Sequence, residues 1–172
     1  MDRPKYVILV TTILIAMCCA ACSRNNSVIV PLLLGSVGAS AVARIQVQED
    51  FIYAAELQYE FKENDPNDRS QQWKLAGGST KIGSGNWIEP CAPLKVSIKV
   101  HRKELKSLKL LAEEIVERPC LSSWGATSLN AELFAILLTP GTYEFTVESI
   151  ETAPSFIGAR TSLRVGKAYR GK

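Results

Sequence analysis

Polar and apolar residues alternate strictly along three stretches of this chain, which is the pattern of a β-strand with one buried face. The three stretches span residues 53–62, 94–101 and 143–148. Shorter alternations of the same kind occur at 43–47 and 163–165. The pattern predicts a chain made mainly of half-buried strands.

Turn-forming residues separate these strands. A polar turn at 64–68, glycine-rich flexible loops at 77–79 and 83–85, and a tight link at Pro140-Gly141 provide the breaks. Residues 134–139 are apolar on both parities, which predicts a strand in the middle of a packed sheet. We therefore predict an all-β fold, a two-sheet antiparallel β-sandwich.

Two segments allow a second interpretation. Residues 28–43 are largely apolar, but glycines at 35–38 predict a turn between two strands, with a membrane hairpin as the alternative. Residues around 103–117 place leucines and an isoleucine at helical spacing, which predicts one short amphipathic helix. Short strands are the alternative there, because local propensity is a weak guide.

The N-terminus has the layout of a secretory signal, with a basic start, an apolar run at 7–17 and small residues before Cys22. The apolar run is shorter than the roughly 20 residues that span a bilayer. Ala20-Ala21-Cys22 resembles a bacterial lipobox, in which the cysteine is lipidated. We predict a lipoprotein signal peptide at 1–21 and lipidation of Cys22, with a plain secreted protein or an uncleaved membrane anchor as alternatives.

The composition is that of a single globular domain. The chain has 172 residues, of which 47% are hydrophobic and 22% charged, and these values exclude wholesale disorder. We assign 22–27 to a tether, 28–168 to one β-sandwich domain and 169–172 to a tail. Lys and Arg total 20 against 17 Asp and Glu, so the formal net charge of +3 argues against a dedicated nucleic-acid binder.

Cys91 and Cys120 are the two cysteines that remain beyond the signal and Cys22. In an oxidising compartment such a pair predicts a disulfide. It would close a loop of about 30 residues and stabilise the fold by roughly 3.5 kcal/mol. Two separate buried thiols are the alternative, and a catalytic pair of a cysteine with His101 is a further one that would need an activated thiol.

Few residues of this chain are suited to catalysis. The single histidine, His101, lies on the polar parity of its strand beside Lys99 and Lys103, which predicts a solvated surface side chain. The sequence contains no nucleophile elbow, no phosphate-binding glycine motif and no dinucleotide fingerprint. We expect no enzymatic activity, no metal site and no cofactor.

Three tryptophans lie in loop-like sequence, at positions 73, 87 and 124. Two of them, Trp73 and Trp87, fall with Arg69 in the segment 65–87, which joins two alternating strands. Because Trp and Arg are the residue types most frequent at the centres of interfaces, we predict that these three residues contact a protein partner. The alternative is that the indoles cap the ends of the sandwich core.

Five pieces of the sequence carry a family resemblance when they are taken in order. The pieces are Ile29-Val-Pro31, 53–62, 94–102, Leu138-Thr-Pro-Gly-Thr-Tyr143, and Ala153-Pro-Ser-Phe-Ile-Gly158 followed by Ser162-Leu163. In these pieces the chain resembles, over about residues 27–168, a family of small bacterial envelope lipoproteins catalogued as domain of unknown function 5625. The resemblance implies an all-β sandwich in which 103–118 is partly extended. It implies no catalytic residues, and it suggests a relation to toxin systems.

These observations lead to a functional hypothesis. We expect a lipid-anchored, periplasm-facing protein-binding module, placed at the outer membrane because Ser23 rather than Asp follows Cys22. In its specific form, the protein is an immunity or inhibitor protein against a toxin delivered to the periplasm. The alternatives are a structural or accessory envelope lipoprotein and a carbohydrate-binding β-sandwich. We expect no nucleic-acid partner.

Overall fold

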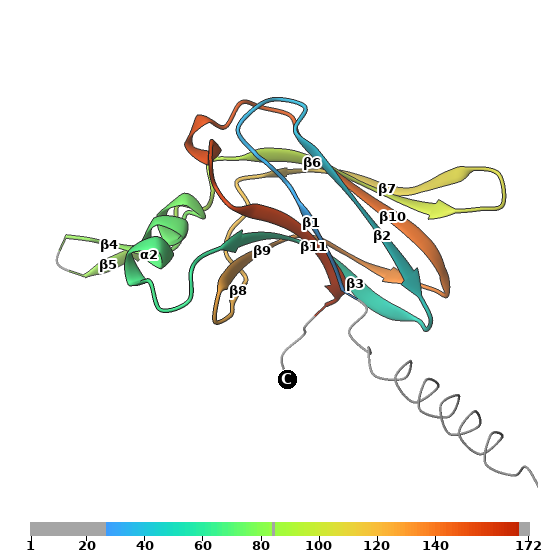
Figure 1. Cartoon of the computed structure of the whole chain (residues 1–172), viewed down its shortest axis with the longest axis horizontal. Helices are drawn as coiled ribbons and strands as arrows, with labels where there is room; N and C mark the ends of the chain where they lie inside the picture. The colour runs from blue at the N-terminus through green and yellow to red at the C-terminus, as the bar shows by residue number, and fades with distance from the viewer. Residues whose placement is uncertain (1–26, 84, 169–172) are drawn as a thin grey trace, which may run out of the picture.

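Two antiparallel β-sheets pack face to face in this protein (Figure 1). The computed structural model describes residues 27–83 and 85–168. The predicted signal peptide, Cys22 and the tail at 169–172 lie outside the described residues, so the structure does not bear on them. The prediction of a two-sheet antiparallel β-sandwich is confirmed.

Each sheet has a simple order of neighbouring strands. The five-stranded sheet runs β1 (Val28–Pro31), β11 (Thr161–Lys167), β3 (Phe51–Glu60), β9 (Ser128–Leu138) and β8 (Ser123–Trp124). The four-stranded sheet runs β2 (Ser40–Val47), β10 (Gly141–Ser149), β6 (Lys95–Lys103) and β7 (Leu108–Glu117). A separate ribbon pairs β4 (Thr80–Ile82) with β5 (Asn86–Ile88), and two short helices are α2 (Pro66–Leu75) and η1 (Pro154–Phe156).

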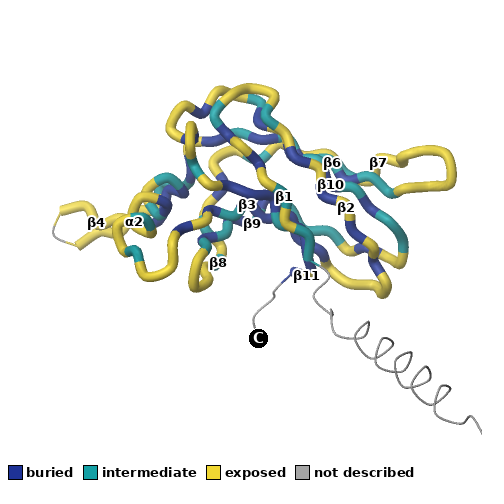
Figure 2. Tube along the Cα trace, in the orientation of Figure 1, coloured by how far each residue is buried: buried dark blue, intermediate teal, exposed yellow. Residues whose placement is uncertain are grey.

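The core lies between the two large sheets, and the alternating stretches supply it. The apolar parity of the alternating stretches is buried, and dark tube segments mark buried residues along these strands (Figure 2). The largest fully buried side chains include Tyr53, Leu57 and Tyr59 of β3, Ile98 of β6, Tyr143 and Phe145 of β10, and Phe156 of η1. Burial at about 25 cal/mol per Å² of apolar surface is the main stabilising contribution to such a fold.

The predicted helix around 103–117 is wrong. Most of this segment is β7, which pairs with β6 from Lys95↔Glu117 to Lys103↔Leu108 and carries a bulge opposite Val100/His101. Only Ala112 and Val116 pack against the core, whereas Leu108, Leu111 and Ile115 are exposed. Backbone pairing with β6 therefore determines the structure of this segment, and the apolar side chains at helical spacing are not buried.

Two further predictions about strands have different outcomes. Residues 28–43 form β1 and the start of β2 with a bend at 35–38, as predicted. Residues 134–139 are not in the middle of a sheet, because β8 pairs only with Leu129 and Asn130 and leaves the rest of β9 at an edge. Leu137 is accordingly 66% exposed.

The tight link at Pro140-Gly141 carries the chain from one sheet to the other, from β9 to β10. The Tyr143 hydroxyl donates a hydrogen bond of 2.8 Å to the backbone oxygen of Thr139, four residues upstream. Arg102 donates to the Pro140 oxygen at 3.0 Å, and its guanidinium lies 5.9 Å from the centroid of the Tyr143 ring. This arrangement is a tyrosine corner of the kind that fixes strand crossings in β-sandwiches.

We expect Tyr143→Phe to lower the free energy of unfolding by about 1–2 kcal/mol, because it leaves the Thr139 oxygen without its side-chain donor. Urea denaturation of the two proteins measures the difference.

Tyr59→Phe is the matched control for that measurement. The Tyr59 hydroxyl is buried without a hydrogen-bond partner among the described residues, and burial raises the pKa of this phenol well above its ordinary value. Removing it should leave the stability unchanged or higher. Equal losses in the two variants would show that the corner hydrogen bond contributes nothing specific.

Candidate functional site

A projecting segment leaves the end of β3 and returns to the start of β6, and we name it the helix–hairpin segment (residues 61–94). It consists of α2 and the β4–β5 ribbon, which extend away from the sandwich on the left of Figure 1. The predicted contact surface at 65–87 lies wholly within it. The segment is the largest departure of the described chain from a plain sandwich.

Helix α2 begins at the predicted polar turn, so that prediction missed a helix. The Asp65 carboxylate caps it by accepting hydrogen bonds from the backbone N–H groups of Asn67 at 3.1 Å and Asp68 at 3.0 Å, and Pro66 opens the first turn. The helix has no apolar stripe, and only Gln72 within it is buried. Its capping residues were the signal in the sequence that could have revealed it.

The end of α2 is held by close backbone packing at two glycines, which the sequence suggested to be a flexible loop. Gly77 has φ +65°, and a Cβ there would lie 2.0 Å from the backbone of Cys91. A Cβ on Gly78 would lie 2.3 Å from the indole of Trp73. The glycines are therefore required for tight contact as well as for the turn.

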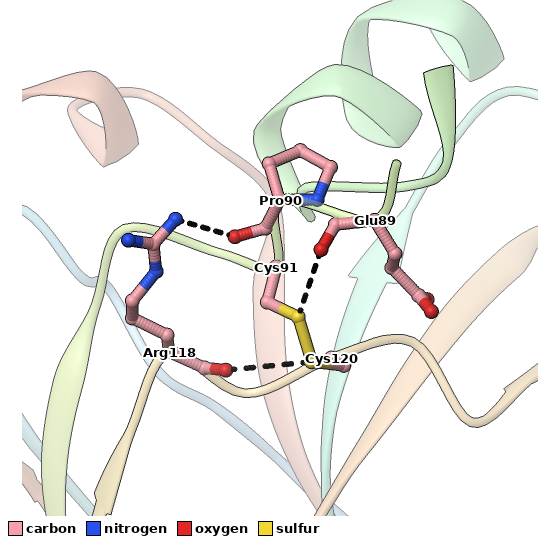
Figure 3. Close-up of a disulfide and its surroundings, with 5 residues drawn as sticks. All are labelled: Glu89, Pro90, Cys91, Arg118 and Cys120. Carbon is pink, nitrogen blue, oxygen red and sulfur yellow. Dashed lines mark hydrogen bonds between the residues drawn. A yellow bond between two sulfur atoms is a disulfide. The ribbon is translucent and has the colours of Figure 1, made fainter. Parts of the chain in front are cut away.

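The disulfide between Cys91 and Cys120 closes the base of the helix–hairpin segment, as predicted (Figure 3). It joins the returning chain to the residues that follow β7. Alongside it, Arg118 donates to the Pro90 oxygen at 2.6 Å and the Ala92 N–H donates to the Pro119 oxygen at 3.0 Å. A covalent bond and two hydrogen bonds thus fix the same junction.

Asp68 ties the first turn of α2 to the sandwich. Its carboxylate accepts a hydrogen bond of 2.6 Å from the Lys62 N–H and forms an ion pair with Arg160, which follows η1. The hydrogen bond from Lys62 and the charge of Arg160 hold the pKa of Asp68 below its ordinary value of 3.8. The ionised carboxylate is therefore the form that holds the helix in place.

The β4–β5 ribbon exposes apolar side chains on both of its faces. Trp87 is 67% exposed opposite Lys81, while Ile82 and Ile88 lie on the other face at 54% and 43%. Its strands are three residues long, and a two-stranded ribbon of this size is only marginally stable in water. Exposed Trp and Ile on a ribbon without a core of its own are typical of a surface that a partner covers.

The structure treats the three predicted contact residues differently. Trp87 is exposed on the ribbon, and Arg69 is exposed on α2 with its guanidinium 5.6 Å from the Phe61 ring centroid. Trp73 is half-buried against the core and donates a hydrogen bond of 3.0 Å from Nε1 to the Ser79 oxygen. Trp73 thus has a packing role, in line with the alternative considered for the indoles.

Ile82 and Ile88 are candidate contact residues that the sequence did not predict. Their strands are too short to show an alternation, so no pattern singled them out. An open hollow of about 410 Å³ adds to the surface beside Arg69, between the start of α2 and Ala126. The candidate contact surface therefore comprises Arg69, Ile82, Trp87 and Ile88.

The remaining chemical candidates do not gather into a site. His101 is half-buried rather than solvated, and its Nδ1 is buried without a hydrogen-bond partner among the described residues. The Glu144 carboxylate on the neighbouring strand binds Arg44 at 2.7 Å. Within 27–83 and 85–168, no three His, Cys, Asp or Glu side chains are grouped as metal ligands, and no helix is long and apolar enough to cross a membrane.

The fold and this site define a two-sheet β-sandwich domain with one projecting, disulfide-closed segment. Residues 29–167 match the family model described as Domain of unknown function (DUF5625). The chain therefore belongs to this family, which confirms the resemblance seen in the sequence.

Two solved structures were compared with this chain, and the first shares its fold. A crystal structure of a protein from Sulfurospirillum deleyianum has a TM-score of 0.65 at 18% sequence identity, and the match covers 84% of this chain and 99% of that one. A family 35 carbohydrate binding module from an environmental isolate has a TM-score of 0.37 at 14% identity, with 80% of this chain and 71% of that one covered. Among curated proteins, no sequence matches this chain.

The pKa of Asp68 leads to a pH-dependent prediction. Because its folded pKa is depressed, the ionised carboxylate contributes stability above about pH 3.8, and this contribution is lost as the pH falls through the lower folded value. Asp68→Asn should therefore unfold at lower temperature than the wild type at pH 7, and the difference should close in acid. Thermal melts from pH 7 to pH 2 measure it.

Asp50→Asn is the control for this series, since Asp50 lies in the turn between β2 and β3, far along the chain from α2. It should melt like the wild type at every pH. A gap between Asp68→Asn and wild type that persists unchanged at pH 2 would contradict the assigned role of the carboxylate.

Proposed function

We propose that this protein is a lipid-anchored binding module of the bacterial cell envelope that holds a protein partner through the helix–hairpin segment. The observation that carries the proposal is the β4–β5 ribbon, which exposes Trp87, Ile82 and Ile88 while its base is fixed by a disulfide. A fixed base with exposed aromatic and aliphatic side chains is the arrangement of an interface hot spot.

The positions of the chain ends support this proposal. Ser27 lies beside Gly166, and the Ala168 N–H donates to the Ile52 oxygen at 2.8 Å, so both described ends lie at the start of β3. The helix–hairpin segment leaves the other end of β3, and this strand of 10 residues spans roughly 30 Å. A lipid on Cys22 would then leave the contact surface directed away from the membrane.

In its specific form, the protein is an immunity or inhibitor protein that blocks a toxin in the periplasm by binding alone, without catalysis. The surface that supports this form is apolar at the ribbon, where Lys81 lies opposite Trp87. Such a surface suits a protein partner with an apolar centre and a carboxylate that can pair with Lys81. Binding to a glycan or a purely structural role are the competing functions.

Trp87→Ala should weaken partner binding by about 2 kcal/mol, roughly thirtyfold, if Trp87 is a hot spot. The melting temperature should stay the same, because the indole is 67% exposed. Trp124 on β8 is also 67% exposed, so Trp124→Ala is the matched control and should bind like the wild type.

The measurement uses a photoreactive amino acid at position 87 or 124 in cells of the source bacterium. A discrete protein adduct from position 87 and none from position 124 supports protein binding. Sensitivity of a deletion strain to its wild-type siblings supports a role as an immunity protein. The deletion strain should be rescued by Trp124→Ala and not by Trp87→Ala. Cross-links only to peptidoglycan or glycan would refute protein binding.

Lipid anchoring has a separate test. The Cys22→Ser protein should lack the added mass of the lipid on its N-terminal residue. It should be soluble or uncleaved, because several acyl chains hold a lipoprotein in a membrane. Mass spectrometry and membrane fractionation measure both effects. A Cys22→Ser protein with unchanged mass class and unchanged fractionation would contradict the anchor.

A further inference from the structure

The hairpin of β6 and β7 projects from the end of the sandwich opposite to the helix–hairpin segment (Figure 1). Its base is tied to the end where the described chain begins and stops. Arg102 binds the Pro140 oxygen, Pro140 follows β9, and Leu138 of β9 pairs with Phe51 at the start of β3. The backbone N–H of Ala168 donates a hydrogen bond to the oxygen of Ile52, which follows Phe51 in β3. We call residues 102–111 the basic tip.

Several large apolar side chains at this end are exposed. Leu105 is fully exposed at the turn of the hairpin, and Leu108, Leu110 and Leu111 follow it at 40% exposure or more. At the same end of the sandwich, Ile52 and Leu137 form an exposed pair across β3 and β9. Exposed apolar surface of this kind is normally covered by something.

The basic tip also carries unneutralised positive charge. Lys103, Lys106 and Lys109 make no ion pair with another described residue, and Glu104 is the single acid among 102–111. An open hollow of about 660 Å³ is lined by Arg102, Lys103, Lys109, Leu105 and Leu111, together with Glu104. Cations alternate with leucines here, so that charge and apolar surface are presented together.

The adjoining sequence has the same sign. Residues 22–27 contain Arg24, and residues 169–172 contain Arg170 and Lys172, without any acid in either segment. Near the start of β3 the acids are Glu49, which pairs with Lys167, and Asp50. The described residues at this end are therefore apolar in part, and the sequence segments that adjoin them contain bases and no acid.

We propose that the basic tip docks directly on an anionic phospholipid surface, with Leu105 and its neighbouring leucines entering the headgroup layer and the lysines binding lipid phosphates. Apolar burial combined with cation–phosphate attraction is the general basis of interfacial membrane binding. This inference depends on the proposed lipid anchor in one respect, because the anchor determines which end of the molecule faces the membrane.

A second copy of the chain is the competing occupant, because β7 is a free edge strand. The charges of β7 argue against pairing with a second copy. Beyond the bulge, residues 112–117 of β7 contain three acids and no base. Lys99 and Lys95 of β6 already pair with two of these acids, Glu113 and Glu117, so antiparallel pairing of this part with a second copy would add acids and no opposite charge. The membrane fits the tip better, because an anionic surface complements its cations.

The experiment places an environment-sensitive fluorophore on Leu105→Cys in the disulfide-intact protein and adds vesicles. With phosphatidylglycerol–phosphatidylcholine vesicles the emission should shift to the blue, and doxyl-labelled lipid should quench it. With pure phosphatidylcholine, or at high salt, the shift should be small. The same fluorophore on Ile82→Cys, at the opposite end, should show no shift.

Charge variants identify the surface. Lys106→Gln with Lys109→Gln should weaken docking on the anionic vesicles about thirtyfold, since each lysine near such a surface contributes roughly a fivefold effect. Lys74→Gln with Lys81→Gln makes the same change of charge on the helix–hairpin segment and should have no effect.

Three results would overturn the inference. They are equal shifts on anionic and neutral vesicles, no effect of the tip lysines, and a dimer in solution that Leu105→Ser dissociates. Retention of the unlabelled protein on vesicles after a salt wash reports the lipid anchor separately. The salt-wash assay therefore tests the lipid anchor, and the fluorescence assay tests docking of the basic tip, so failure of one proposal can be distinguished from failure of the other.

Discussion

The packing of two sheets through one parity of their strands is the constraint on which the other features of this protein depend. Once alternate side chains such as Tyr59, Ile98 and Phe145 are buried between the sheets, much of the outer parity carries polar pairs. On the four-stranded sheet these include Arg44 with Glu144 and Lys99 with Glu113. Exposed ion pairs of this type contribute little stability and offer little for recognition. The candidate contact surfaces therefore lie mainly on the parts that leave the sandwich.

The helix–hairpin segment shows how a part without a core is stabilised. Helix α2 has no apolar stripe and the β4–β5 ribbon has no second layer, so neither can fold on burial alone. Local polar contacts replace burial, with Asp65 at the helix start and Asp68 bound to Arg160. The Cys91–Cys120 disulfide then limits how far the segment can move. The ribbon can expose Trp87 because its position does not depend on burying that side chain.

How far the sequence predicts the structure depends on the range of the interactions involved. Strands with one buried face are predicted well, because a period of two reflects burial directly, and the Leu138-to-Tyr143 motif marks a real sheet crossing. The helix prediction over 103–117 is wrong, because Leu105, Leu108, Leu111 and Ile115 have helical spacing although pairing with β6 determines the structure from Leu108 onward. Helix α2 and the clustering of the tip lysines were not predicted, because neither shows a periodic pattern in the sequence. Polar caps, and charges gathered by a hairpin turn, have no periodicity to detect.

With the proposed lipid anchor and the proposed docking of the basic tip, the two projecting parts would have complementary consequences. A tether such as 22–27 would by itself let the domain tumble, and a partner would then have to bear the entropic cost of fixing its orientation. A second contact through the basic tip would remove most of that freedom before any partner arrives. It would hold β3 directed away from the lipid, with Trp87 and Arg69 at the far end of the molecule. Membrane docking at one end would thus strengthen binding at the other without a direct contact between the two, because the orientational freedom is already lost.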